Sequence, residues 1–222
     1  MRGWLRVSMG IILLSVGVAS GEVLFREDFE SGELTRWDIG TSTSAQVSVV
    51  EFPPGSGNYA LKINYVWPKD KNAYTVGVMT KKSFGSDYIL EFDSWAEKIQ
   101  SRIVINLRID FNPTSNIIRR TASLWTDMNH RYRLMYRESK LGGVNEIISP
   151  SLRDVFDGKK HHWKITVKGV NITVEIDEGR YKFMVPPELV SITEGDYRIG
   201  FSALNFPMYY DNVVISTITG QE

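Results

Sequence analysis

The sequence predicts an all-β protein, built as a single two-sheet antiparallel β-sandwich, and three observations lead to this prediction. After residue 21, apolar and polar side chains alternate with a period of two in many short segments, which is the pattern of half-buried strands. Gly, Pro, Asn and Asp separate these segments at short intervals, as turn residues do. The chain has 222 residues, and about 200–250 residues is a common size for one all-β domain.

The alternating segments follow one another along the chain without a linker. In order, they are residues 46–51, 59–67, 74–84, 88–95, 102–111, 121–127, 132–138, 161–168, 170–177, 181–185, 197–203 and 209–216. Turn signals such as Pro53-Pro54-Gly55, Gly142-Gly143 and Asp157-Gly158 stand between them. About a dozen short strands of this kind indicate one sandwich, so residues 22–222 are expected to form a single domain.

Residues 1–21 have the pattern of a secretory signal peptide. Arg2 and Arg6 form a short basic region, residues 9–19 are apolar, and small residues follow at 18–21, where a signal peptidase would cut. An apolar run of about 11 residues is too short to cross a bilayer, which needs about 20. We therefore expect an exported protein, secreted or periplasmic, with no membrane span after signal cleavage.

The charge balance excludes one class of partner. Lysine and arginine together number 26, as do aspartate and glutamate. Removing residues 1–21, which carry two arginines and no acid, leaves a net charge of −2. A nucleic-acid-binding domain would show a basic excess, so no nucleic-acid partner is expected. The sequence has no cysteine, so the fold must rest on its core without disulfides.

Three motifs resemble the concanavalin A-like lectin/glucanase superfamily, including its laminin G-like members. They are FREDFESG at residues 25–32 with Trp37 after it, DGKKHHWKITV at residues 157–167, and YRIGF with YYDNVVI at residues 197–201 and 209–215. These motifs resemble the opening, middle and closing strands of that superfamily and bracket nearly the whole chain after residue 21. The resemblance implies a concanavalin A-like jelly roll.

The fold does not choose among the functions that this superfamily carries. We expect a secreted, lectin-like module that binds a polysaccharide or a cell-surface glycan on one sheet face. The alternatives are a glycoside hydrolase or polysaccharide lyase of the same fold, and a cell-surface structural or adhesion protein. A glycan array beside a reducing-sugar assay would separate these three.

The resemblance also raises a catalytic candidate. The glucanase branch carries an E-x-D-x-E or E-x-D-x-x-E strand, in which one carboxylate is the nucleophile and the other the general acid. Glu91 and Asp93 match its first two acids, and Glu97 follows one residue late. In a regular strand, Glu91 and Glu97 would lie about 20 Å apart, too far for either pairing. The alternative is a solvated polar strand face.

The resemblance further implies a structural calcium ion where the first and last strands meet. Asp211 matches the side-chain ligand, while Asp28 and Gly57 sit where backbone carbonyls would contribute. Hard oxygen ligands of this kind suit Ca²⁺. The alternative is that Asp211 only caps its strand through backbone hydrogen bonds.

Strand parity suggests where a glycan would bind. In residues 102–111, one row is apolar, consisting of Ile103, Ile105, Leu107, Ile109 and Phe111, and is expected to face the core. If the neighbouring strands lie in the same sheet, the opposite rows form one polar face that holds Asp93, Trp95, Asn106, Arg108, Asp110, Trp125 and Arg133. Aromatic rings beside charged and amide groups are typical of sugar sites, although an ordinary wet sheet face has similar groups.

Overall fold

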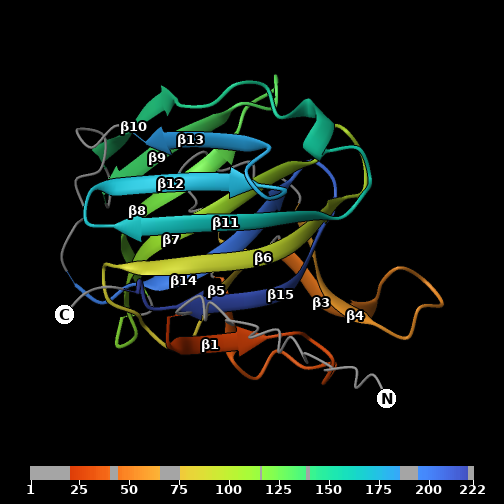
Figure 1. The fold of residues 1–222 in the computed structure, drawn as a ribbon. Helices are drawn as coiled ribbons and strands as arrows, with labels where there is room; N and C mark the ends of the chain where they lie inside the picture. The colour runs from red at the N-terminus through yellow and green to blue at the C-terminus, as the bar shows by residue number, and fades with distance from the viewer. Residues whose placement is uncertain are drawn as a thin grey trace, which may run out of the picture.

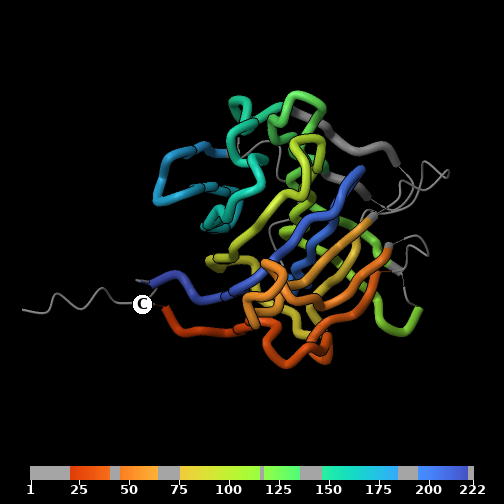
Figure 2. Tube along the Cα trace, turned by 90° about the vertical axis from the view of Figure 1, so that its right-hand side faces the viewer, coloured from red at the N-terminus to blue at the C-terminus, as the bar shows by residue number. Residues whose placement is uncertain are grey.

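The computed structural model describes residues 21–40, 45–65, 76–115, 117–138, 141–185 and 195–219. Two antiparallel sheets, A and B, pack face to face. Sheet A lies in front of sheet B in Figure 1, and Figure 2 shows the same molecule after a turn of 90° about the vertical axis. This confirms the predicted all-β, two-sheet antiparallel sandwich. In the described part of the chain, no helix is long and apolar enough to span a bilayer. The signal peptide is predicted over residues 1–21, and residues 1–20 of it lie outside the described residues.

Sheet A is built around the last strand of the chain. In spatial order, its strands within the described residues are β13 (Tyr181–Val185), β12 (Asn171–Ile176), β11 (His161–Lys168), β6 (Tyr88–Ala96), β15 (Met208–Ser216), β4 (Tyr59–Tyr65) and β3 (Ala45–Glu51), and β1 (Val23–Glu27) pairs with β15. β4 pairs with the first half of β15 and β1 with its second half. The opening and closing motifs are therefore neighbours in one sheet.

Sheet B holds the middle of the chain. Its described strands are β10 (Leu141–Ile147), β9 (Tyr132–Glu138), β8 (Ile117–Thr126), β7 (Arg102–Asn112), β14 (Arg198–Leu204), β5 (Val78–Thr80) and β2 (Trp37–Ile39). A short 3₁₀ turn, η1 (Arg153–Val155), precedes β11. Gly142 and Gly143 were expected to form a turn, but they lie inside β10 where the pairing with β9 shifts register. Two consecutive glycines have no side chains to pack, which allows such an irregularity.

The strand expected over residues 74–84 is shorter in the structure. Only β5 remains of it, with an isolated bridge from Phe84 to Tyr197 beyond. Residues 66–75 lie outside the described residues. β2 was not predicted, because three residues are too few to show a period of two.

The core fills the space between the sheets with the inward rows of the strands. On β11, Trp163, Ile165 and Val167 are buried and alternate with more exposed residues. Trp163 stacks on Phe92 of β6, with ring centroids 5.8 Å apart, and Tyr132 of β9 meets it edge-on at 5.7 Å. Aromatic contacts of this geometry add to the burial of apolar area, so they join sheet A to sheet B across the middle of the sandwich.

A bulge in β7 reverses the predicted parity halfway along the strand. Ile103, Ile105 and Leu107 face the core as expected, but the pairing with β8 shifts register between Asn106 and Arg108. A bulge adds one residue to a strand and turns the following side chains to the other face. Arg108 consequently points between the sheets, where it is fully buried. Its prediction as an exposed sugar ligand is therefore wrong.

The apolar residues after the bulge face away from the core. Ile109 and Phe111 belong to a small separate cluster with Val76, Met79 and Ile118. The guanidinium group of Arg198 lies 4.4 Å from the centroid of the Phe111 ring. The prediction that Ile109 and Phe111 continue the core row is therefore wrong, because the bulge moves them to the outer face of sheet B.

Candidate functional site

The structure divides the predicted polar face between two opposite surfaces. β6 belongs to sheet A, whereas β7, β8 and β9 belong to sheet B. Glu91, Asp93 and Trp95 therefore lie on the outer face of sheet A, and Asn106, Trp125 and Arg133 on the outer face of sheet B. No single ligand surface joins the two groups, because the sandwich separates them. The prediction of one shared face is corrected on this point.

The outer face of sheet B carries a groove of about 530 Å³. It is lined by Arg102, Trp125, Thr126, Asp127, Met128, Asn129, Arg133 and Met135. β7 and β9 supply the arginines, β8 supplies the tryptophan, and the turn between β8 and β9 closes one end. Ligand sites commonly have volumes of about 300–1,000 Å³, so the groove is large enough for a sugar unit.

Trp125 stands on the sheet surface between two neighbouring strands. Its backbone pairs with Val104 of β7 on one side and with Arg133 of β9 on the other. Its ring packs against Val104 and Leu204 and remains partly exposed. One row further along, Ser123 Oγ donates a hydrogen bond of 2.7 Å to Asn106 Oδ1. Asn106 is buried there, so it supports the strand pair beneath the groove and does not reach into it.

Asp127 holds the turn at the end of the groove. Its carboxylate accepts hydrogen bonds from the backbone N–H groups of Asn129 (2.8 Å) and Arg131 (3.0 Å). It also pairs with the guanidinium groups of Arg131 at 3.1 Å and Arg133 at 3.5 Å. Burial acts to raise the pKa of Asp127, but these hydrogen bonds and the Arg131 charge outweigh it and hold the pKa below its usual value. Asp127 is therefore an ionised anchor that positions the arginines.

Asp110, the remaining predicted ligand, lies at the far end of β7. Its carboxylate pairs with Arg120 at 3.0 Å and Arg119 at 3.4 Å. Asp110 does not line the groove. Its interactions are those of a charged strand end.

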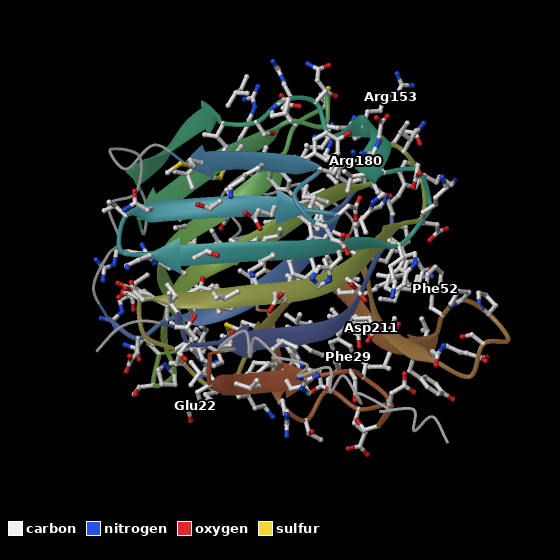
Figure 3. The ribbon with its side chains drawn as sticks, in the orientation of Figure 1. Glu22, Phe29, Phe52, Arg153, Arg180 and Asp211 are labelled. Atoms are coloured by element: carbon white, nitrogen blue, oxygen red, sulfur yellow. The ribbon has the colours of Figure 1, made fainter. Side chains whose placement is uncertain are left out.

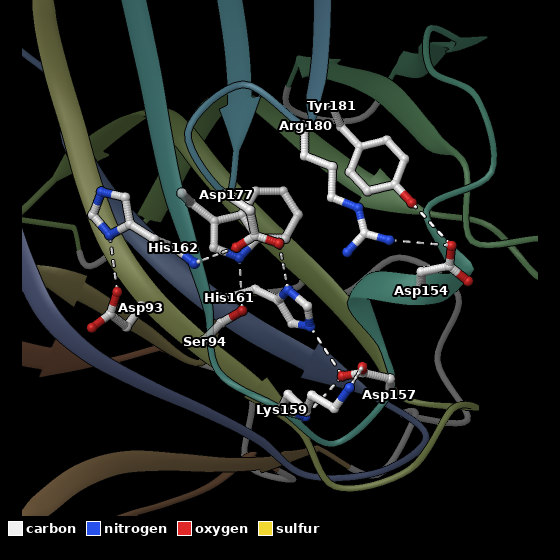
Figure 4. A network of polar contacts seen from close by, with 11 residues as sticks. Asp93, Ser94, Asp154, Asp157, Lys159, His161, His162, Asp177, Arg180 and Tyr181 are labelled. Carbon is white, nitrogen blue, oxygen red and sulfur yellow. Dashed lines mark hydrogen bonds and ion pairs between the residues drawn. The ribbon is translucent and has the colours of Figure 1, made fainter.

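On sheet A, Asp93 is the centre of a polar network. It accepts a hydrogen bond from His162 Nδ1 at 2.9 Å (Figure 4). It also accepts hydrogen bonds from Asn212 Nδ2 at 2.9 Å and Lys160 Nζ at 3.2 Å. Burial acts to raise its pKa, but the hydrogen bonds from His162 and Asn212 and the Lys160 charge outweigh it and lower the pKa. A general acid needs a raised pKa. Asp93 therefore has the properties of a hydrogen-bond acceptor that is ionised at neutral pH.

Glu91 and Trp95 flank this network. The Glu91 carboxylate lies 3.8 Å from His162 Nε2. Trp95 meets the ring of Phe52 edge-on at 5.5 Å, and Lys160 Nζ lies 5.8 Å from the centroid of the Trp95 ring. These contacts occupy part of the Trp95 ring surface. None of Glu91, Asp93 and Trp95 lines the groove on sheet B.

A second histidine network was not predicted from the sequence. His161 is buried between two carboxylates, with Nδ1 2.7 Å from Asp177 Oδ2 and Nε2 3.0 Å from Asp157 Oδ1 (Figure 4). Burial acts to raise the pKa of Asp157, but the hydrogen bonds from His161 and Lys159 lower it to about 2. The network ties the segment before β11 to the β12–β13 turn. Adjacent residues on a strand point to opposite faces. The sequence therefore indicates that His161 and His162 have different partners, but not which partners they have.

Asp211, the predicted calcium ligand, lies among other acids. Figure 3 shows it at the same end of sheet A as Phe29 and Phe52. Burial and the nearby charges of Asp93 and Glu30 raise its pKa to about 6, against the hydrogen bond from the Asn212 backbone. A cation would relieve this repulsion, so the donor chemistry fits Ca²⁺.

The other predicted calcium ligands are on the same side of the fold. Glu30, two residues after Asp28, accepts a hydrogen bond of 3.0 Å from the backbone of Tyr59, two residues after Gly57. Within the described residues, no group of three or more His, Asp or Glu side chains is arranged to hold a metal. A calcium ion at Asp211 would therefore need backbone carbonyls, as the resemblance implies.

Comparison with solved structures shows several proteins of similar architecture. The carbohydrate-binding module CBM66 from Bacillus subtilis has a TM-score of 0.52 at 13% identity, covering 82% of this chain and 96% of that one. A β-glucanase from Bacillus licheniformis has a TM-score of 0.56 at 14% identity, over 89% and 99%. A GH16 protein of the mixed linkage glucan PUL of Bacteroides ovatus has 0.57 at 14%, over 86% and 99%.

Sequence comparison is less informative, since a scan of protein-family models and a search of curated proteins both found no match. The structural neighbours thus include a carbohydrate-binding module and glycoside hydrolases of one fold. At identities of 12–14%, the likeness establishes the fold and leaves the activity open. This chain therefore has the jelly-roll fold of the concanavalin A-like lectins and glucanases.

Proposed function

We propose that this chain is a carbohydrate-binding protein that holds a polysaccharide segment in the groove beside Trp125. The observation that carries the proposal is the partly exposed Trp125 ring lining a cavity of about 530 Å³. Pyranose rings have C–H-rich faces that pack on aromatic rings, while their hydroxyl groups need hydrogen-bond partners. The groove offers both kinds of surface within one sheet face.

The polar groups of the groove are suited to hydroxyl recognition. Arg102 and Arg133 line it with guanidinium donors, which present several N–H groups in a fixed plane. The ion pair with Asp127 restrains Arg133, so less side-chain entropy is lost on binding. The similarity to a carbohydrate-binding module and to glucan-acting proteins supports the same class of ligand.

The groove favours binding over cleavage. Hydrolysis by the usual glycosidase mechanism needs two carboxyl groups that flank the scissile bond. Among the described residues that line the groove, Asp127 is the one carboxylate, and its oxygens already bind the turn and two arginines. Glu91 and Asp93 lie on the opposite face of the sandwich.

A glycan array combined with a reducing-sugar assay tests the proposal directly. We expect saturable binding to at least one polysaccharide without release of reducing ends. Release of sugar from the bound polysaccharide would instead identify an enzyme. Absence of binding across neutral and acidic polysaccharides would contradict the proposal and favour a structural or adhesion role.

Trp125 and Trp95, both partly exposed, provide a matched pair of variants. Trp125→Ala should weaken polysaccharide binding by about 1–3 kcal/mol, judged from aromatic stacking platforms in nucleic-acid binders, or about fivefold to more than a hundredfold. Trp95→Ala removes the same side chain from the opposite face and should leave the affinity unchanged. Isothermal titration calorimetry on the glycan found by the array would measure both. Equal losses in the two variants would contradict a groove on sheet B.

A further inference from the structure

A second hollow, of about 420 Å³, lies at the seam between the two sheets. It is lined by Leu24, Phe25, Thr35, Arg36, Lys81 and Lys82. Leu24 and Phe25 belong to β1 of sheet A, whereas the other four flank β2 and β5 at the edge of sheet B. Its volume is within the range of ligand sites. None of its residues lines the groove beside Trp125.

Three cations converge on this hollow and are held in place by backbone carbonyl groups. Lys81 Nζ donates to Thr35 O at 2.9 Å, and Lys82 Nζ donates to Leu24 O at 2.9 Å. Arg36 Nη1 donates to Arg26 O at 2.5 Å. The Lys82 and Arg36 bonds cross from the edge of sheet B to β1 of sheet A, whereas the Lys81 bond joins the segments beside β5 and β2 within sheet B. The positions of the cations are therefore set by the fold.

Within the described residues, no carboxylate lies within ion-pair distance of the three side chains Arg36, Lys81 and Lys82. Carbonyl oxygens are neutral acceptors, so they orient the cations without neutralising them. An ammonium group has three N–H donors and a guanidinium group has five, so each cation keeps donors for a ligand.

Apolar rings further restrict the cations. The Arg36 guanidinium group lies 5.8 Å from the centroid of the Phe25 ring, and Lys82 Nζ lies 5.7 Å from that of Phe84. Contacts of this kind are attractive and leave the charged groups less free to turn into solvent. Cations that are already ordered lose little entropy when an anion binds.

We propose that this hollow binds a phosphate or sulfate group carried by a sugar or a similar small ring. A tetrahedral oxyanion presents three terminal oxygens and so can meet three separate cations, whereas a carboxylate presents only two. The volume exceeds the need of a single ion and leaves room for a ring over Leu24 and Phe25. The site is separate from the groove beside Trp125 and does not depend on the function proposed for it.

Binding of small probes to the folded protein tests the ligand class. Glucose 6-phosphate and glucose 6-sulfate should bind saturably in NMR titrations, with glucuronate at least about tenfold weaker and glucose not binding. Inorganic phosphate and sulfate, used as parallel probes, distinguish the oxyanion from the ring. Phosphate has a second pKa of about 6, so phosphate-ester binding should strengthen from about pH 5 to 7 while sulfate-ester binding stays constant. Equal affinity for glucuronate, or no saturable binding, would overturn the proposal.

Charge-removing variants locate the site. Lys81→Gln and Arg36→Gln should each weaken glucose 6-sulfate binding at least about tenfold, whereas Lys168→Gln, at an exposed lysine of β11, should have no effect. Thermal melting shows whether each variant folds, and Arg36→Lys, which keeps the charge, provides a second test if Arg36→Gln does not. Trp125→Ala should leave this binding unchanged. An equal loss in Lys168→Gln would show unspecific attraction and overturn the assignment.

Discussion

At the scale of single residues, Asp211 has the clearest consequence for stability. Its pKa of about 6 in the folded chain exceeds the ordinary value of about 3.9. A folded state that holds its proton more tightly than the unfolded state loses stability as the pH rises between these two values. Without a cation, the ionised carboxylate therefore destabilises the fold at neutral pH.

The variant Asp211→Asn tests this reasoning. In a chelator near pH 7, it should raise the free energy of unfolding by about 1–2 kcal/mol, less than the full pKa shift because the carboxyl is partly solvated. Near pH 4, the gain should vanish, since the wild-type carboxyl is then largely protonated in the folded state. Urea denaturation at both values of pH measures the difference. An equal gain in the free energy of unfolding at both values of pH would contradict a raised pKa of Asp211 as its cause.

In the presence of calcium, Asp211→Asn should lower the free energy of unfolding relative to the wild type, the opposite of its effect in chelator. If Ca²⁺ binds at Asp211, a hundredfold excess over its dissociation constant stabilises the wild type by about 2.7 kcal/mol. Asp211→Asn should lose most of that gain and become the less stable protein in calcium. If neither calcium nor chelator changes the melting temperature of the wild type, Asp211 does not bind calcium.

At the scale of elements, the bulge in β7 places a charge inside the sandwich. Arg108 Nη2 donates to Ser86 O at 3.1 Å and to Gly169 O at 2.6 Å, which joins the start of β6 to the β11–β12 turn. Arg108→Leu would remove the donor from both carbonyl groups, and we expect a loss of about 2–5 kcal/mol. Arg119→Leu, at a side chain that is 59% exposed, should cost less than about 1 kcal/mol. Denaturant midpoints compare the two variants, and a stabilised Arg108→Leu protein would show that the buried guanidinium is dispensable.

Strand parity in the sequence predicts the faces of the strands but not the sheets to which they belong. Strand parity was sufficient for the sandwich and for placing Trp95 and Trp125 on outer faces, because a period of two assigns side chains to faces. Parity does not show which sheet a strand joins. β6 and β7 are consecutive in the sequence but lie in different sheets, so the two tryptophans are separated by the core.

The bulge itself could not be predicted. The row from Ile103 to Phe111 alternates without interruption in the sequence, yet the pairing with β8 shifts at Leu107. Such a shift depends on the partner strand and on the carbonyl groups that accept hydrogen bonds from Arg108, and these are distant in the sequence. The role of Asp127 at the end of the groove could not be predicted either. In the sequence it is only the last residue of an expected strand, and its hydrogen bonds with the backbone of Asn129 and Arg131 depend on the conformation of the turn.

At the scale of the whole molecule, the export prediction can be tested by mass spectrometry. The exported protein should begin near Gly21 or Glu22, since the small residues before them suit signal peptidase. Intact mass measured on protein from the medium and from the cell envelope would locate the new terminus. Recovery of the chain with Met1 in place from those fractions would contradict cleavage.

The pairing of β1 with β15 also constrains how the chain reaches its native state. Phe25 pairs with Ile215, and a hydrogen bond from the Glu22 backbone to Thr217 spans 195 residues. β15 lies within sheet A, with β6 on one side and β4 and β1 on the other. The sheet can therefore close only after the final strand has been synthesised, and contacts of such long sequence separation slow folding. A nascent chain that lacks β15 would remain incomplete and expose unpaired strand edges, so loss of a few residues from β15 should impair folding more than the same loss from an edge strand such as β13.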